Sequence, residues 1–284
     1  MPDFLLPLRR RVTATVKNRI KTSPFLVRHR SRFTNIYHCT VYRTGSQWLR
    51  RILSDLRVCR YSGLLYEMHF QRIFGTITHP DRTVTYDTFP YERPFPECRI
   101  VGLYASHERY LRIPHPAAHR TFCVLRDPRD IVVSHYFASR RDARRVNGPS
   151  RETLSSPAEG IPYMMDLLDN MGLFAALRSW ALMPANAQTL LLRFEALTGS
   201  LQQETFWRLF SHCDIAMPDQ VLQELLEDHS FSRMAEGREP GEENPESHYR
   251  KGLPGDWKNH FTTAHIDRFK EITGDLVTRT GYVW

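Results

Sequence analysis

Long apolar runs are absent from this sequence of 284 residues, and no stretch approaches the ~20 apolar residues that a membrane-spanning helix needs. Cysteine is scarce: there are five, widely spaced and without a C-x-x-C pair. That pattern argues against a disulfide framework or a zinc site, so we expect a reducing compartment. The basic cluster near the start follows a very short apolar patch, the wrong order for a secretory signal, so we expect a cytoplasmic protein.

The phosphate loop of nucleoside triphosphatases, G-x-x-x-x-G-K-[ST], is also absent. No aspartate follows an apolar run in the manner of a metal-holding Walker B strand. A metal-dependent NTPase is therefore disfavoured, and we expect no metal site. What the sequence does contain is YRTGSQW (residues 42–48), a turn between an apolar strand and a basic amphipathic helix.

Strands alternate with helices along the chain. Apolar, β-branched segments predict strands at 33–42, 98–104, 120–126 and 189–194. Helical spacing predicts helices at 46–57, 128–145, 161–183, 200–211 and 218–228. This order predicts an α/β fold with a mainly parallel sheet flanked by helices. Residues 60–97 fit no regular element, and 235–257, rich in Gly, Pro and charge, predict a mobile loop.

Positive charge is concentrated at the beginning of the chain. Residues 1–32 hold nine lysines and arginines and one aspartate, which accounts for the whole net charge of +8. We expect a basic arm (1–32) ahead of a single domain (33–284). The arm could lie on an anionic membrane surface, on nucleic acid, or in solvent near an anionic ligand's entrance, and we favour the solvated arrangement.

Three segments carry groups suited to anions. In the first, the backbone amides after Tyr42 can point into one concave site, Gly45 permits close approach, Thr44 and Ser46 can donate, and Arg43 adds a cation. An ordinary glycine turn is the plain alternative.

The second segment is TFCVLRDPRDIVVSHY (121–136). Arg126 ends a strand and Ser134 lies in the next helix. Ligands of doubly wound sheets bind beyond the carboxyl ends of the strands, so Arg126 could hold a phosphate bidentately with Ser134 donating to it. A structural ion pair of Arg126 with Asp127 or Asp130 is the alternative.

The third segment is HYRKGLPGDWKNHF (248–261), in which Arg250, Lys251 and the amide of Gly252 form a cationic clamp. Nearby glutamates leave open a merely solvated charge run.

Together the three segments resemble the motifs of the cytosolic-type sulfotransferases, which use 3′-phosphoadenosine 5′-phosphosulfate (PAPS). YRTGSQW is similar to their Y-P-K-S-G-T-T-W loop, VLRDPRDIVVSHY to R-N-P-x-D-x-x-x-S, and RKGLPGDWK to R-K-G-x-x-G-D-W-K. The resemblance spans roughly residues 34–265. It implies a P-loop-NTPase-like three-layer sandwich and an enzyme that uses PAPS as co-substrate without a metal.

The resemblance also implies roles for individual residues. The 5′-phosphosulfate loop would be Arg43, Thr44, Gly45, Ser46, Gln47 and Trp48, with Trp48 near the adenine. The 3′-phosphate would be held by Arg126, Ser134, Arg250, Lys251 and Gly252. Phe194 and Phe231 stand where the family has aromatic residues close to the purine.

The family's general base is a histidine between the first two motifs, and His107 follows a strand at that place. Its ordinary pKa of ~6.5 allows a neutral imidazole near pH 7. His115 and His119 are close rivals by sequence. The implied reaction is in-line sulfuryl transfer, in which His107 takes the acceptor's proton while Arg43 and the loop amides stabilise charge on the leaving phosphate.

The chain also departs from the family pattern. Arg43 replaces a lysine, Gln47 a threonine and Phe194 a tyrosine. The dimer motif K-x-x-x-T-V-x-x-x-E is only faintly echoed in KNHFTTAHID (258–267), so a dimer is weakly supported. The rival functions are a P-loop-type small-metabolite kinase and a non-catalytic nucleotide- or nucleic-acid-binding protein, although we expect no nucleic acid.

The acceptor cannot be read from these motifs. Aromatic residues between 61 and 95 could line an acceptor pocket or belong to the core, and polar residues lie among them. A small molecule, a glycan or a lipid-linked acceptor all fit, with a hydroxyl (or amine) of a small molecule or glycolipid preferred.

Overall fold

The computed structural model describes residues 26–69, 76–79, 82–85, 93–142 and 154–284, with the backbone alone for 76–79 and 82–85. Most of the predicted basic arm lies outside these residues, as do most of the aromatic and acidic residues considered for an acceptor pocket between 70 and 92. The predictions about those residues therefore stay predictions.

Within the described residues, seven strands form two sheets. They are β1 (Asn35–Thr40), β2 (Leu65–Met68), β3 (Thr76–His79), β4 (Arg82–Thr85), β5 (Arg99–Tyr104), β6 (His119–Leu125) and β7 (Thr189–Arg193). The larger sheet has the order β2-β5-β1-β6-β7, and every neighbouring pair in it is parallel. β3 and β4 pair antiparallel in the second sheet. The predicted mainly parallel sheet is confirmed.

Helices connect the strands. The α-helices are α2 (Ser46–Leu53), α3 (Leu56–Arg60), α4 (His107–Leu111), α5 (Pro128–Asp142), α6 (Pro157–Asn170), α7 (Leu173–Ala181), α8 (Phe194–Thr198), α9 (Gln202–His212), α10 (Asp219–Asp228), α11 (Phe231–Met234), α12 (Thr263–Thr273) and α13 (Leu276–Arg279), with the 3₁₀ turn η1 (Asp256–Asn259). The predicted helix over 161–183 is two helices, because Gly172 adopts a φ of 73° and separates α6 from α7.

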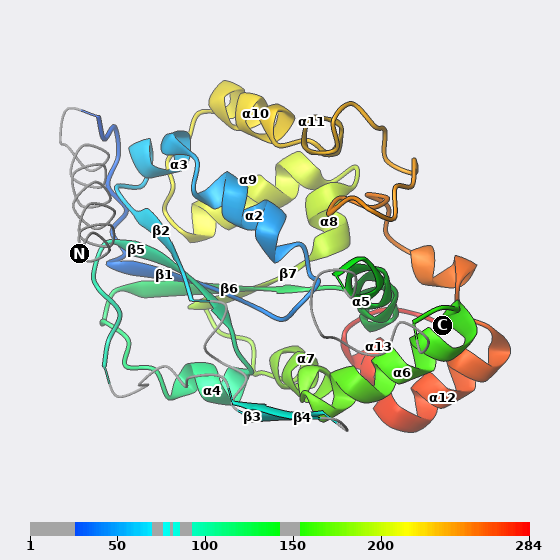
Figure 1. Ribbon diagram of the computed structural model, residues 1–284. Helices are drawn as coiled ribbons and strands as arrows, with labels where there is room; N and C mark the ends of the chain where they lie inside the picture. The colour runs from blue at the N-terminus through cyan, green and yellow to red at the C-terminus, as the bar shows by residue number, and fades with distance from the viewer. Residues whose placement is uncertain (1–25, 70–75, 80–81, 86–92, 143–153) are drawn as a thin grey trace, which may run out of the picture.

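Helices cover both faces of the larger sheet, as Figure 1 shows. Alternate residues of a strand point to opposite faces. Accordingly, Ile36 of β1 packs in a core with α2, α3, α9 and α10, whereas Tyr37 packs in a second core with α4, α6, α7, α12 and α13. These two cores make the predicted three-layer sandwich.

The central strand β1 is buried along its whole length. Its last residue, Thr40, lies opposite Tyr104 of β5 and Val124 of β6. Because the three strands are parallel, the loops after β1, β5 and β6 leave the sheet at the same edge, at the carboxyl ends of the strands. That edge is where open α/β sheets bind their ligands.

The loop over 235–255 contains turns and bends but no helix or strand. Its backbone is nevertheless hydrogen-bonded, from Gly241 N to Lys251 O (2.7 Å) and from Asn244 N to Arg250 O (2.9 Å). Arg238 also donates to the carbonyls of Tyr249 and Arg250 (2.6 and 3.0 Å). Of the segment predicted as irregular, 235–257, residues 235–255 are confirmed and residues 256–257 instead begin η1, while the predicted mobility stays a prediction.

Candidate functional site

The turn after β1 has a backbone shaped for close approach. Arg43 adopts a φ of 67° and Gly45 one of 80°. A positive φ is uncommon for arginine, and such residues gather at functional sites. A Cβ on Gly45 would lie 2.4 Å from the Phe194 ring, so only glycine fits between the turn and that ring. Gly45 then caps α2, whose first amides face the same edge of the sheet.

Hydroxyl groups fix this turn from inside. Thr44 Oγ1 donates to the carbonyl of Val41 (3.0 Å) and pairs with the hydroxyl of Thr40. Ser46 Oγ hydrogen-bonds to the hydroxyl of Tyr104 (2.8 Å), the last residue of β5. Thr44 and Ser46 are both buried. Their side chains hold the turn, so the predicted anion-binding groups that remain are its amides and Arg43.

Arg43, Ser134 and Arg126 meet although they are far apart in sequence. Arg43 Nε donates to Ser134 Oγ (3.0 Å), and Arg126 Nη1 donates to the carbonyl of Arg43 (2.9 Å). Thus two predicted anion-binding segments form one cationic group at the carboxyl end of the sheet.

The alternative partner predicted for Arg126 is partly present. Its Nη2 lies 3.9 Å from Asp130, a long ion pair, and its guanidinium stacks on the Phe194 ring at 4.6 Å. Its buried Nε has no hydrogen-bond partner among the described residues. Asp130 accepts instead from the amides of Gly255 (2.6 Å) and Trp257 (2.9 Å), and burial raises the pKa of its carboxyl. Arg126 therefore keeps donor capacity beyond its ion pair.

Two of the predicted purine-side aromatics, Trp48 and Phe194, lie at the start of α2, and the third, Phe231, lies against the third segment. Trp48 meets the Phe194 ring edge-on at 6.4 Å and donates from Nε1 to the carbonyl of His229 (2.8 Å). The Phe231 ring lies against Gly252, where an added Cβ would be 2.4 Å away. The third segment thus adjoins Phe231, the first residue of α11 (Phe231–Met234).

The cations of the clamp have acidic partners here. Arg250 binds Asp256 and Glu243 (2.6 Å to Glu243), and Lys251 Nζ lies 2.5 Å from Asp256 Oδ1. Burial alone would raise the pKa of Asp256, but hydrogen bonds from His260, Lys251 and Arg250 hold it well below its ordinary value. The predicted alternative of a solvated charge run does not hold, because the side chains of Arg250 and Lys251 are only 14% and 19% exposed and Asp256 joins both cations.

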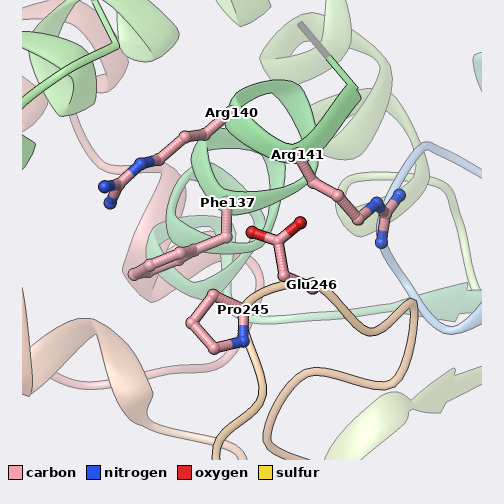
Figure 2. Close-up of a pocket in the computed structure, with 5 residues that line it drawn as sticks. All are labelled: Phe137, Arg140, Arg141, Pro245 and Glu246. Carbon is pink, nitrogen blue, oxygen red and sulfur yellow. The ribbon is translucent and has the colours of Figure 1, made fainter. Parts of the chain in front are cut away.

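A shallow pocket of about 180 Å³ adjoins the clamp. It is lined by Phe137, Arg140, Arg141, Pro245 and Glu246. Figure 2 shows the Glu246 carboxylate turned toward α5, with the guanidinium groups of Arg140 and Arg141 pointing away to either side. The Arg250 guanidinium stacks on Phe137 at 4.1 Å, so the pocket shares one wall with the clamp.

His107 is the first residue of α4, three residues beyond the end of β5. Its amide donates to Ser179 Oγ (2.9 Å), and its imidazole lies 5.0 Å from the Trp180 ring. Burial lowers the pKa of His107, so the neutral imidazole dominates at pH 7.

The rival histidines lie elsewhere. His119 begins β6, so it lies at the opposite end of the sheet from the turn of Arg43. His115 stacks on it at 4.7 Å and meets Tyr37 of the core at 4.7 Å. Burial lowers the pKa of His115 to about 4. Of the three, His107 alone follows the carboxyl end of a strand.

Tyr104 and Glu195 belong to this neighbourhood and were missed by reading the sequence, whereas Asp130 and Asp256 stand in the second and third segments. Of the two missed residues, Tyr104 carried a sequence signal, because it ends a strand. Within the described residues, no group of three or more histidine, cysteine or acidic side chains has an arrangement that could hold a metal ion. In the same part of the chain, no helix combines the length and apolar character needed to cross a bilayer.

The fold and these groups define an α/β protein with a composite anion site. The model of the sulfotransferase domain family matches residues 34–281, and the chain belongs to that family. Human sulfotransferase 1C2 is 25% identical over 162 residues, covering 52% of this chain and 51% of the relative. Mouse sulfotransferase 2B1 is 23% identical over 201 residues (64% and 54%). The chain spans about half the length of these curated relatives.

Solved structures share the fold. Mouse sulfotransferase SULT7A1 complexed with PAP superimposes with a TM-score of 0.59 at 17% identity, covering 92% of this chain and 89% of that one. Retinol dehydratase in complex with androsterone and inactive cofactor PAP gives 0.58 at 14% identity, covering 94% and 88%. The predicted P-loop-NTPase-like sandwich and the predicted family are confirmed.

Proposed function

We propose that this protein is a PAPS-dependent sulfotransferase that moves the sulfuryl group to a hydroxyl or amine of an acceptor. The observation that carries the proposal is the convergence of Arg43, Ser134 and Arg126 at the carboxyl end of the sheet. Membership in the sulfotransferase domain family supports it, as does the fold shared with PAP-complexed sulfotransferases.

The donor's two anionic ends would have separate partners. Arg43, the amides of residues 44–48 and the start of α2 would hold the 5′-phosphosulfate, because helix N-termini and successive amides bind anions. Arg126 and Ser134 would hold the 3′-phosphate, with Arg250, Lys251 and the amide of Gly252 closing over it. Trp48, Phe194 and Phe231 would border the adenine.

The residues divide the chemistry between them. His107, neutral at pH 7, would accept the proton of the acceptor group as that group's oxygen or nitrogen bonds to sulfur. The bond between sulfur and the phosphate oxygen breaks, and Arg43 would stabilise the negative charge left on that oxygen. The products are the sulfated acceptor, PAP and a proton on His107. PAPS supplies the whole sulfuryl group and no atom changes its oxidation state, so the reaction needs no oxidant and no metal.

We propose a small-molecule acceptor, with a glycan or glycolipid as the other classes that the sequence allows. The retinol dehydratase structures contain androsterone or retinol, both small apolar alcohols. Two aromatic residues considered for an acceptor pocket, Tyr66 and Phe95, pack in or against the core here.

The remaining parts of the proposal rest on the sequence. We propose a basic arm over 1–32 that lies in solvent, with contact to an anionic membrane surface as the alternative, one sulfotransferase domain over 33–284, and a cytoplasmic location. A dimer through 258–267 is the weakest part. The kinase and nucleic-acid-binding alternatives gain no observation from the site.

The test is transfer itself. Purified protein is incubated with PAPS and separate panels of phenols, aliphatic alcohols, amines and oligosaccharides in EDTA, and products are detected by the mass of an added sulfuryl group. We expect at least one acceptor class to be sulfated, and the product to disappear in His107→Asn. Transfer of phosphate from ATP that requires Mg²⁺, with no sulfated product in any panel, would contradict the proposal.

A further inference from the structure

The turn that presents Arg126, residues 126–130, is made mostly of charged residues and is deeply buried. Asp127, Arg129 and Asp130 are 5%, 2% and 1% exposed. Buried charges require partners, and those partners fix where the turn lies. Asp130 finds two of them in the amides of Gly255 and Trp257, next to the clamp. The other side of the turn is held by residues that the proposed reaction does not use.

Glu195 and Tyr282 hold the beginning of the turn. Glu195 Oε1 accepts from the amide of Asp127 (3.2 Å), and Glu195 Oε2 accepts from the hydroxyl of Tyr282 (2.6 Å). Glu195 directly follows Phe194, the ring on which Arg126 stacks. Burial raises the pKa of Glu195, and burial also raises that of Tyr282, so the phenol stays a donor at neutral pH.

Arg129 connects the turn to Val283 and Trp284, the two residues after Tyr282. Its Nη2 donates to Asp127 Oδ2 and to the carbonyl of Val283, both at 2.7 Å. Its guanidinium lies over the Trp257 ring at 3.8 Å and the Trp284 ring at 4.9 Å. Figure 1 places this end of the chain beside α5, in agreement with these contacts.

We propose that residues 282–284 form a latch that positions Arg126 for recognition of the 3′-phosphate, with Tyr282 and Glu195 as positioning residues. The inference rests on the proposed function and deepens it. Arg126 is positioned by the backbone of its turn and by the Phe194 ring on which it stacks. Glu195 connects the two, because it follows Phe194 in the chain and accepts from the amide of Asp127, the residue after Arg126. Tyr282 of the latch holds Glu195 in that place.

The geometry explains why one hydroxyl matters. Glu195 has two oxygens and a different partner on each, so losing Tyr282 leaves one carboxylate oxygen without its donor in a buried place. The carboxylate is then free to turn toward Arg126, whose charge already favours its ionised form. A misplaced arginine binds a phosphate less well because a bidentate contact depends on orientation.

Tyr282→Phe removes only the hydroxyl. The matched control is Tyr136→Phe on α5, which removes the hydroxyl that donates to the carbonyl of Leu154 (3.2 Å). Calorimetry measures the affinity of each full-length variant for PAP and for adenosine 5′-phosphate, which lacks the 3′-phosphate. We expect Tyr282→Phe to lower the PAP-to-AMP affinity ratio by about threefold to tenfold, the effect of one buried hydrogen bond, and Tyr136→Phe to leave it unchanged.

General destabilisation would weaken both nucleotides alike and would leave the ratio unchanged, so an unchanged ratio in Tyr282→Phe overturns the inference. If that variant is too unstable to titrate, amide hydrogen exchange decides with Glu195→Gln, which keeps the shape but offers one acceptor instead of two. The amide of Asp127 should exchange faster in Glu195→Gln than in wild type, and unchanged protection overturns the latch.

The two proposals fail differently. Wild-type protein that binds PAP no better than AMP overturns the proposed function and, with it, this inference. Wild-type protein that distinguishes the two nucleotides while Tyr282→Phe distinguishes them equally well overturns the latch alone.

Discussion

Arg43 Nε donates a hydrogen bond to Ser134 Oγ across 91 positions of sequence. The contact joins the turn after β1 to the second turn of α5, so the residue proposed for the 5′-phosphosulfate touches one proposed for the 3′-phosphate. We predict that Arg43→Ala lowers kcat by about 10²–10³, the usual effect of removing one donor to developing charge. Initial rates at saturating PAPS measure it.

Arg43→Lys is the informative companion, because lysine keeps the charge but loses the planar fork. We expect it to retain more activity than Arg43→Ala. Equal rates in wild type and Arg43→Ala would contradict a role for this side chain in transfer.

Gly45 tests whether the turn must touch Phe194. Gly45→Ala adds a Cβ 2.4 Å from that ring at a φ of 80°, and Gly172→Ala adds one at a φ of 73° with nothing within 4 Å. Both variants carry the backbone strain of about 1–2 kcal/mol, and only the first carries the clash. We expect Gly45→Ala to lose more stability in chemical denaturation and to weaken PAP binding, while Gly172→Ala keeps wild-type binding. Equal behaviour of the two variants would contradict the packing argument.

His107 makes the reaction pH-dependent. A base works when neutral, and burial lowers the pKa of this imidazole below its ordinary 6.5. The rate should therefore rise with pH through a midpoint below 6.5 and be level by pH 7, measured as kcat/KM. His107→Asn should lower kcat by about 10²–10⁴, the usual contribution of general base catalysis. An unchanged acid limb in that variant would assign the base to another group.

Asp256 organises the clamp and should govern stability at acid pH. It accepts from Arg250, Lys251, Asn259 and His260. Because its folded pKa is depressed, its contribution is present above its unfolded pKa of about 3.9 and is lost as pH falls below that value. Asp256→Ala should lower the free energy of unfolding by about 3–5 kcal/mol at pH 7, because it removes the acidic partner of Lys251 and one of the two acidic partners of Arg250.

Urea denaturation of wild type and Asp256→Ala at pH 7 and pH 3 measures this contribution. The difference between them should shrink at the lower pH. A difference that is the same at both would show that the charge on Asp256 is not what stabilises the clamp.

Much of the fold could be predicted from the sequence because its central strands are strongly apolar. Four of the five strands in the larger sheet were located, and β2 was missed because LYEM is short and lies in an irregular stretch. The break between α6 and α7 was missed because it occupies only Met171 and Gly172, and the helical spacing of apolar residues continues on both sides of them.

The site was predictable in its ligand-facing residues and not in its supporting ones. Arg43, Arg126 and Ser134 stand in recognisable motifs, and the sheet brings them together. Asp256 stands in the third segment and contacts residues within six positions of it. Glu195 and Tyr282, in contrast, act through a tertiary contact between residues 87 positions apart. No local pattern encodes such a pairing, because it depends on how the last helices pack against α5.

The most direct test of the central claim is calorimetric titration of the full chain with PAP in EDTA, with adenosine 5′-phosphate and ATP as controls. We predict micromolar or tighter binding that requires the 3′-phosphate, needs no metal and weakens strongly in Arg126→Ala. Absence of PAP binding, or ATP binding that appears only when Mg²⁺ is restored, would contradict the sulfotransferase assignment and favour the kinase.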